Sequence, residues 1–144
     1  FVVMVQRFAL VLVTFLLFVS CRKNNQNPVP NVPVDITIDL GLPSYYNLQG
    51  VSGYAYVMGG SRGIVVYRKS LDEFVAFDRH SPADPEGTCA FPLYTNPNNF
   101  LELLDSCNSA IFSLYDGSAI ANSNFGLRQY ATQYNGANSL HIYN

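Results

Sequence analysis

The sequence predicts an all-β domain over residues 34 to 144. Tyr and Phe each occur ten times, whereas only 12% of the residues are charged, and aromatic residues favour strands. Short apolar segments alternate with turns rich in Gly, Pro, Asn and Asp, and no segment has the periodicity of an amphipathic helix. These 111 residues suffice for one domain with one core.

The first half of this domain contains four predicted strands. In "VDITIDL", residues 34 to 40, apolar and polar residues alternate as in a half-buried strand. Residues 41 to 53 are loop-like, and "YAYVMGG" is a short strand that ends in two glycines. Residues 63 to 70 and 73 to 78 form the two strands of a hairpin with a tight turn.

The second half begins with an irregular segment. Residues 79 to 99 hold four prolines and little periodicity, which predicts a long loop that is either functional or held in place. Residues 100 to 104 are expected to form a strand. "AIFSLYDGSAI" predicts two strands around a turn at Asp116-Gly117, and a final hairpin turns near Asn135-Gly136.

Residues 1 to 20 resemble a secretory signal peptide, because Arg7 precedes an apolar run that is too short for a comfortable membrane span. "FVSC" resembles a bacterial lipobox, which implies cleavage before Cys21 and lipidation of that residue. The alternative is a plain signal peptide with an incidental cysteine. Residues 21 to 33 are polar and proline-rich, so we expect a flexible tether.

The tract "NNQNPVPNVP" resembles that of Bacteroidetes lipoproteins, in which acidic residues after the cysteine accompany surface export. Arg22 and Lys23 stand there instead, so we expect a periplasm-facing lipoprotein of the cell envelope, in the inner or the outer membrane.

The domain has five basic and ten acidic residues, a net charge near −5, which argues against nucleic acid as a partner. We expect a monomer whose membrane contact is the lipid; a protein or small-molecule partner is not specified.

Two cysteines, Cys89 and Cys107, remain once Cys21 is assigned to the lipid. An even pair in an exported domain favours a disulfide, with two free thiols as the alternative.

Three segments together resemble the Rieske iron–sulfur domain over residues 59 to 144: "RGIVVYRKSLDEFVAFDRHSPADP", "DSCNSAIFSLYDGSAI" and "LRQYATQYNGANSLHIYN". The resemblance implies an antiparallel β-sandwich with two loops at the cluster site. In the family these loops carry C-x-H and C-x-x-H boxes, whose two Cys and two His bind a [2Fe–2S] cluster. Asp78 and Arg79 match the residues before the first box, and Phe112 and Gly117 keep the spacing after the second.

All four cluster ligands of the family are replaced in this chain. Ser81 and Ala83 stand at the Cys and His of the first box, and Asp105 and Asn108 stand at those of the second. His80 falls on a variable position. The resemblance therefore implies a Rieske-like domain that has lost its cluster.

The resemblance also bears on the two cysteines. Cys107 occupies the slot of a disulfide that joins the two cluster loops in some Rieske domains, and Cys89 in the first loop would be its partner. Such a bond closes a loop of about 18 residues and would stabilise the fold by roughly 3 kcal/mol.

Other sites are weighed beside this one. His80, Asp84, Glu86 and Asp105 either form a zinc or other divalent-cation site or are solvated loop residues. A nucleophile and base at Ser81 and His80 are disfavoured, because adjacent side chains in an extended segment point apart. Five aromatic residues either line a binding surface or serve packing: Tyr45, Tyr46, Tyr54, Tyr56 and Phe91.

We therefore expect a non-enzymatic, membrane-anchored lipoprotein with a binding or structural role. It is expected to have no catalytic residues, no metal and no cofactor. The alternatives are electron transfer through a [2Fe–2S] cluster and a small metal-binding protein or hydrolase that uses the histidine and carboxylates of the loops.

Overall fold

The computed structural model describes residues 1–7 and 26–144 of the chain. Most of the expected signal peptide and the expected lipidation site, Cys21, lie outside the described residues. Within the described part, no helix has both the length and the apolar character needed to cross a membrane.

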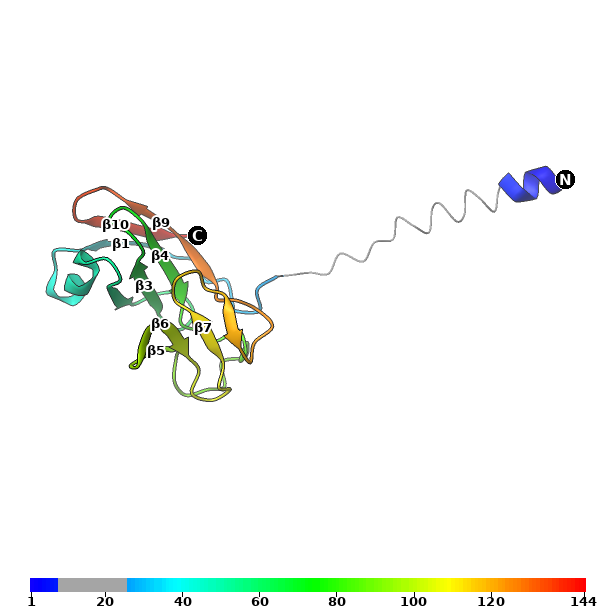
Figure 1. Ribbon diagram of the computed structural model, residues 1–144. Helices are drawn as coiled ribbons and strands as arrows, with labels where there is room; N and C mark the ends of the chain where they lie inside the picture. The colour runs from blue at the N-terminus through cyan, green and yellow to red at the C-terminus, as the bar shows by residue number, and fades with distance from the viewer. Residues whose placement is uncertain (8–25) are drawn as a thin grey trace.

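Two antiparallel sheets make up the domain (Figure 1). The larger sheet is curled into a half-barrel with the order β1-β10-β9-β4-β3-β2. Its strands are β1 (Asp35–Asp39), β2 (Tyr54–Val57), β3 (Ile64–Arg68), β4 (Phe74–Asp78), β9 (Gln129–Tyr134) and β10 (Ser139–Tyr143). The smaller sheet contains β5 (Tyr94–Asn96), β6 (Asn99–Leu104), β7 (Ile111–Ser113) and β8 (Ala119–Ala121), in that order. The all-β prediction and the predicted hairpins are confirmed.

The hairpin of β3 and β4 lies at the centre of the domain, and every residue of both strands is buried. Because successive side chains of a strand point to opposite faces, Val66 and Ala76 face the interior of the half-barrel, whereas Val65 and Phe77 face the second sheet. The near-continuous apolar sequence of both strands follows from this burial on two faces.

The core between the two sheets is built around Phe77 of β4. Leu103 of β6 and Phe112 of β7 pack in the same cluster and are completely buried. Packing of this cluster places the end of β4 beside the β6–β7 hairpin, so the loops that follow β4 and β6 lie close together.

Two elements differ from the sequence prediction. Residues 41 to 53, expected to be a loop, include the 3₁₀ helix η1 (Pro43–Gln49), which starts with a proline and buries Leu48. Seven residues of 3₁₀ helix make only about two turns, too few to display a helical periodicity in the apolar residues. The loop expected over residues 79 to 99 ends earlier, because β5 pairs with β6 through Tyr94 and Thr95.

The chain before β1 is packed against the domain from residue 27 onward, which differs from the flexible tether expected for this part of residues 21 to 33. Residues 21 to 25 of the expected tether lie outside the described residues. Val29 is buried, and its carbonyl oxygen accepts hydrogen bonds from the Arg128 guanidinium. The Asn27 amide donates to the Gly126 carbonyl. Arg128, about a hundred residues away in the sequence, thus donates hydrogen bonds to backbone carbonyls of this polar, proline-rich segment.

Candidate functional site

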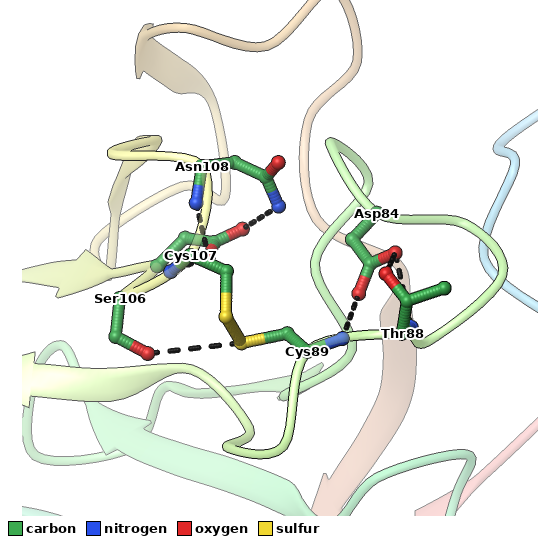
Figure 2. The surroundings of a disulfide bond; sticks show 7 residues. Asp84, Thr88, Cys89, Ser106, Cys107 and Asn108 are labelled. Carbon is green, nitrogen blue, oxygen red and sulfur yellow. Dashed lines mark hydrogen bonds between the residues drawn. A yellow bond between two sulfur atoms is a disulfide. The ribbon is translucent and has the colours of Figure 1, made fainter.

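Two loops meet beside the core between the sheets. We call residues 79 to 93, between β4 and β5, the first loop, and residues 105 to 110, between β6 and β7, the second loop. A disulfide joins Cys89 of the first loop to Cys107 of the second, with a Cα–Cα distance of 5.9 Å (Figure 2). The predicted disulfide is therefore present.

The Asp84 carboxylate shapes the first loop around this disulfide. It accepts hydrogen bonds from the Thr88 backbone N–H and hydroxyl at 3.1 and 2.9 Å and from the Cys89 N–H at 2.8 Å (Figure 2). The bond from Cys89 and those from Thr88 lower the pKa of Asp84 below its ordinary value, although burial acts in the opposite direction. The carboxylate thereby fixes the backbone that carries Cys89.

The Asp105 carboxylate has the same role in the second loop. It accepts hydrogen bonds from the N–H groups of Cys107 and Asn108 at 2.8 and 3.0 Å and from the Asn108 side-chain amide at 3.1 Å. Burial raises the pKa of Asp105, but the nearby Ser81 side chain and the hydrogen bonds from Asn108 and Cys107 outweigh burial, so the pKa is lowered. The Asp105 carboxylate therefore interacts with side chains or backbone of both loops.

Asp78, the last residue of β4, is completely buried and accepts four hydrogen bonds. One oxygen receives the Ser61 N–H and the Tyr130 hydroxyl, each at 2.6 Å, and the other receives the N–H groups of His80 and Arg62 at 2.8 and 3.2 Å. Burial and the bond to Asp78 raise the pKa of Tyr130, so its hydroxyl remains a donor. Four donors compensate the carboxylate for the water that it loses on burial.

His80 is buried, and both of its ring nitrogens have partners. Nδ1 lies 2.7 Å from the Ser61 hydroxyl, and Nε2 lies 2.9 Å from the Asp84 carbonyl oxygen. Since a carbonyl oxygen only accepts, Nε2 carries the proton and donates a hydrogen bond to the Asp84 backbone carbonyl. The side chain therefore fastens the first loop, and His80 and Asp84 are buried structural residues rather than the solvated loop residues that were one of the two expectations.

The four positions that the sequence resemblance aligned with cluster ligands are only partly brought together. Ser81 interacts with Asp105, and Asp105 bonds Asn108, whereas Ala83 packs against the core between the sheets. The alternative metal site of His80, Asp84, Glu86 and Asp105 does not appear as a group of close metal donors among the described residues, and Glu86 is exposed. The second histidine of the chain, His141 on β10, was not part of that site and pairs with Asp35.

Three potential metal donors do lie within 4.8 Å of one another: the sulfurs of Cys89 and Cys107 and a carboxylate oxygen of Asp105. The two sulfurs are bonded to each other, and a metal requires the deprotonated thiolate of a reduced cysteine. In the disulfide form this group offers a single anionic ligand, the carboxylate of Asp105.

Sequence reasoning missed the surroundings of Arg79. The guanidinium stacks on the ring of Tyr56 at 3.8 Å, and its Nε donates to the Leu93 carbonyl at 2.7 Å. Burial lowers the pKa of Arg79 from its ordinary value. The sequence offered no sign of this stacking, because Tyr56 and Arg79 are distant from each other along the chain.

The five aromatic residues singled out in the sequence have different environments. Tyr45 packs against the half-barrel core, and Tyr54 packs against the core between the sheets. Tyr46, Tyr56 and Phe91 are exposed, and Tyr54 and Tyr56 contact each other with ring centroids 5.8 Å apart. Some of the five aromatic residues therefore serve packing, and others lie at the surface.

Comparison of the chain with protein-family models, with curated proteins and with solved structures finds no significant match in any of the three.

We predict that Tyr130→Phe lowers the free energy of unfolding by about 1.5–3 kcal/mol, because it removes a hydrogen bond to a buried charged group. The control is Tyr134→Phe on the same strand, whose hydroxyl donates to the exposed Ala137 carbonyl and whose loss should cost about 1 kcal/mol or less. Urea unfolding of the two variants measures the difference. Equal losses would contradict the importance assigned to Asp78.

Removal of the disulfide in a Cys89→Ala/Cys107→Ala variant should lower the free energy of unfolding by roughly 3 kcal/mol, since the bond closes a loop with a sequence separation of 18. Urea unfolding measures the effect, and reduced wild-type protein serves as the control that should match the variant. Alkylation of both cysteines without reductant, detected by mass spectrometry, would show this prediction to be wrong.

Acid should weaken the two loops through Asp84 and Asp105. Their folded pKa values lie below the ordinary 3.8, so their stabilisation is complete above that pH and is lost as the pH falls through the folded values. We predict that Asp84→Asn/Asp105→Asn flattens the decline of unfolding free energy between about pH 5 and pH 2 relative to the wild-type protein. An unaltered slope in the double variant would refute this.

Proposed function

We propose that this chain is a membrane-anchored, non-catalytic binding protein of the cell envelope, with a Rieske-like domain that has lost its cluster. In this proposal Cys21 carries the lipid, and the domain faces the periplasm as a monomer. The proposal combines the resemblance of the sequence with an arrangement in which the residues at the former ligand positions stabilise the loops.

The observation that carries the proposal is the engagement of Asp105 at a position of a lost ligand. Its carboxylate bonds the backbone of its own loop and interacts with Ser81 of the first loop. The disulfide between Cys89 and Cys107 joins the same loops. These contacts favour a structural use of this region, which leaves the exterior of the domain for binding.

The alternative of electron transfer requires two imidazoles on one iron of a Rieske cluster. The chain contains two histidines: both nitrogens of the His80 ring are engaged, and His141 lies on β10 paired with Asp35. The alternative of a loop metal site would need His80 or Asp84 to abandon the hydrogen bonds that hold the first loop. Both alternatives are therefore less favoured than a binding role.

Anaerobic reconstitution with iron and sulfide tests the proposal. The full chain, purified in detergent, should remain without a visible absorption band and retain no stoichiometric iron or zinc, because its donor set is incomplete. A band with about two irons per chain would overturn the proposal, as would stoichiometric zinc that His80→Ala abolishes.

A gain-of-ligand variant provides the matched control. Ser81→Cys, Ala83→His, Asp105→Cys and Asn108→His, combined, should produce the absorption band and about two irons per chain if the Rieske register is right. Circular dichroism establishes whether this variant is folded. A folded variant without iron would contradict the assignment of these four positions.

A further inference from the structure

Arg79 is a half-buried cation without an acidic partner among the described residues. Within the described residues its Nε donates a hydrogen bond to the Leu93 carbonyl, and neither ion pair of the described part involves Arg79. No buried side-chain nitrogen or oxygen in residues 1–7 and 26–144 lacks a partner, so the two terminal nitrogens of Arg79 reach solvent. These nitrogens are therefore available to an anion that comes from outside.

The guanidinium is one end of a row of aromatic side chains. Arg79 stacks on Tyr56 at 3.8 Å, the Tyr56 and Tyr54 rings lie 5.8 Å apart, and the Tyr54 and Phe100 rings lie 6.4 Å apart. We call Phe100, Tyr54, Tyr56 and Arg79 the aromatic strip. Phe100 and Tyr56 are 58% and 40% exposed, so the strip reaches the surface at the edge strand β2 and at β6.

The strip has an open hollow at each end. One hollow, of about 420 Å³, is lined by Tyr54 and Phe100 together with Asn47 and Val51. The other, of about 400 Å³, is lined by Arg79, Phe91, Pro92, Tyr94 and Ser106. Phe91 and Ser106 belong to the two loops that the disulfide joins, so the disulfide holds the walls of the second hollow.

Tyr56, in the middle of the strip, is held in place by hydrogen bonds within the domain. The Tyr56 hydroxyl is 2.9 Å from both the backbone nitrogen and the hydroxyl of Thr95, which ties β2 of one sheet to β5 of the other. A preorganised surface loses little conformational entropy on binding. Tyr, Phe and Arg are the side chains enriched at the centres of protein interfaces.

The spacing of the rings matches an extended chain. Alternate side chains of a β-strand point to the same face and recur about every 6.6 Å, close to the 6.4 and 5.8 Å between successive rings of the strip. A guanidinium prefers a carboxylate, which it can bind through two parallel hydrogen bonds. Broadly open hollows suit side chains of a larger partner better than an enclosed small molecule.

We propose that the aromatic strip binds an extended peptide segment of a partner protein, in which alternate apolar side chains contact the rings and an Asp or Glu side chain binds Arg79. This inference rests on the proposed binding function and adds the chemical class of the partner. The Asp or Glu of the segment is opposite in charge to Arg79. Because the domain as a whole is acidic, the attraction of this carboxylate depends on Arg79 alone.

Fluorescence anisotropy with two labelled peptides tests the proposal on the full chain in detergent. The probes are acetyl-Phe-Ser-Leu-Ser-Glu-amide and its reverse sequence, because the strip does not specify a direction. At least one should bind, and replacing its Glu by Gln should weaken binding at least fivefold. Binding should also weaken between about 50 and 500 mM salt, since the contact with Arg79 is ionic.

Variants locate the site. Phe100→Ala should weaken binding at least threefold, and Arg79→Gln should abolish the preference for Glu over Gln, which Arg79→Lys should partly restore. Leu71→Ala removes an apolar side chain outside the strip that is more exposed than Phe100, 71% against 58%, and should have no effect. Thermal unfolding establishes that each variant is folded.

Several results would overturn the inference: equal binding of the Glu and Gln peptides, binding that survives Phe100→Ala, the absence of binding by both peptides, or binding of a neutral oligosaccharide such as cellohexaose in their place. A colourless protein that fails to bind peptide contradicts this inference alone, whereas assembly of an iron–sulfur cluster contradicts the proposed function itself.

Discussion

The arrangement of the loops depends on the hydrogen bonds that the buried carboxylate of Asp78 accepts. Asp78 ends β4, the strand buried on both faces, and it orients the first loop by accepting the His80 N–H. From there a continuous series of contacts reaches the second loop. The His80 ring bonds the Asp84 carbonyl, the Asp84 carboxylate bonds the Cys89 N–H, and the disulfide passes to Cys107. Every polar group in this series has a partner, as burial in a low dielectric requires.

The strands of this domain could be predicted from local pattern because burial imposes a period on the side chains. The alternation from Val34 to Leu40 and the apolar runs of β3 and β4 record which faces are covered. The two cysteines carried enough chemical information to suggest their pairing. The strands depend on neighbouring residues in the sequence, and the disulfide depends on cysteine, a residue type that mostly forms disulfides in exported domains.

The polar interior could not be predicted in this way. Whether His80 is solvated or buried depends on Ser61, which lies across the β3–β4 hairpin, and on Asp84 in the loop. The packing of residues 27 to 33 depends on Arg128 near the other end of the chain. Polar side chains have no periodic signal, because the same residue is suited to water or to burial according to the donors that the tertiary structure brings to it.

Asp78 and Arg79 are adjacent in the sequence, but Asp78 has a structural role whereas Arg79 belongs to the proposed binding surface. Successive residues of a strand point to opposite sides, so Asp78 enters the interior and meets four donors, while Arg79 turns outward to Tyr56. Adjacent opposite charges therefore do not neutralise each other through direct contact. The same buried contacts that fix Asp78 and His80 also fix the backbone on which Arg79 stands. A rigid interior of this kind limits the freedom of the exposed cation, so the entropy lost when it binds a carboxylate is small.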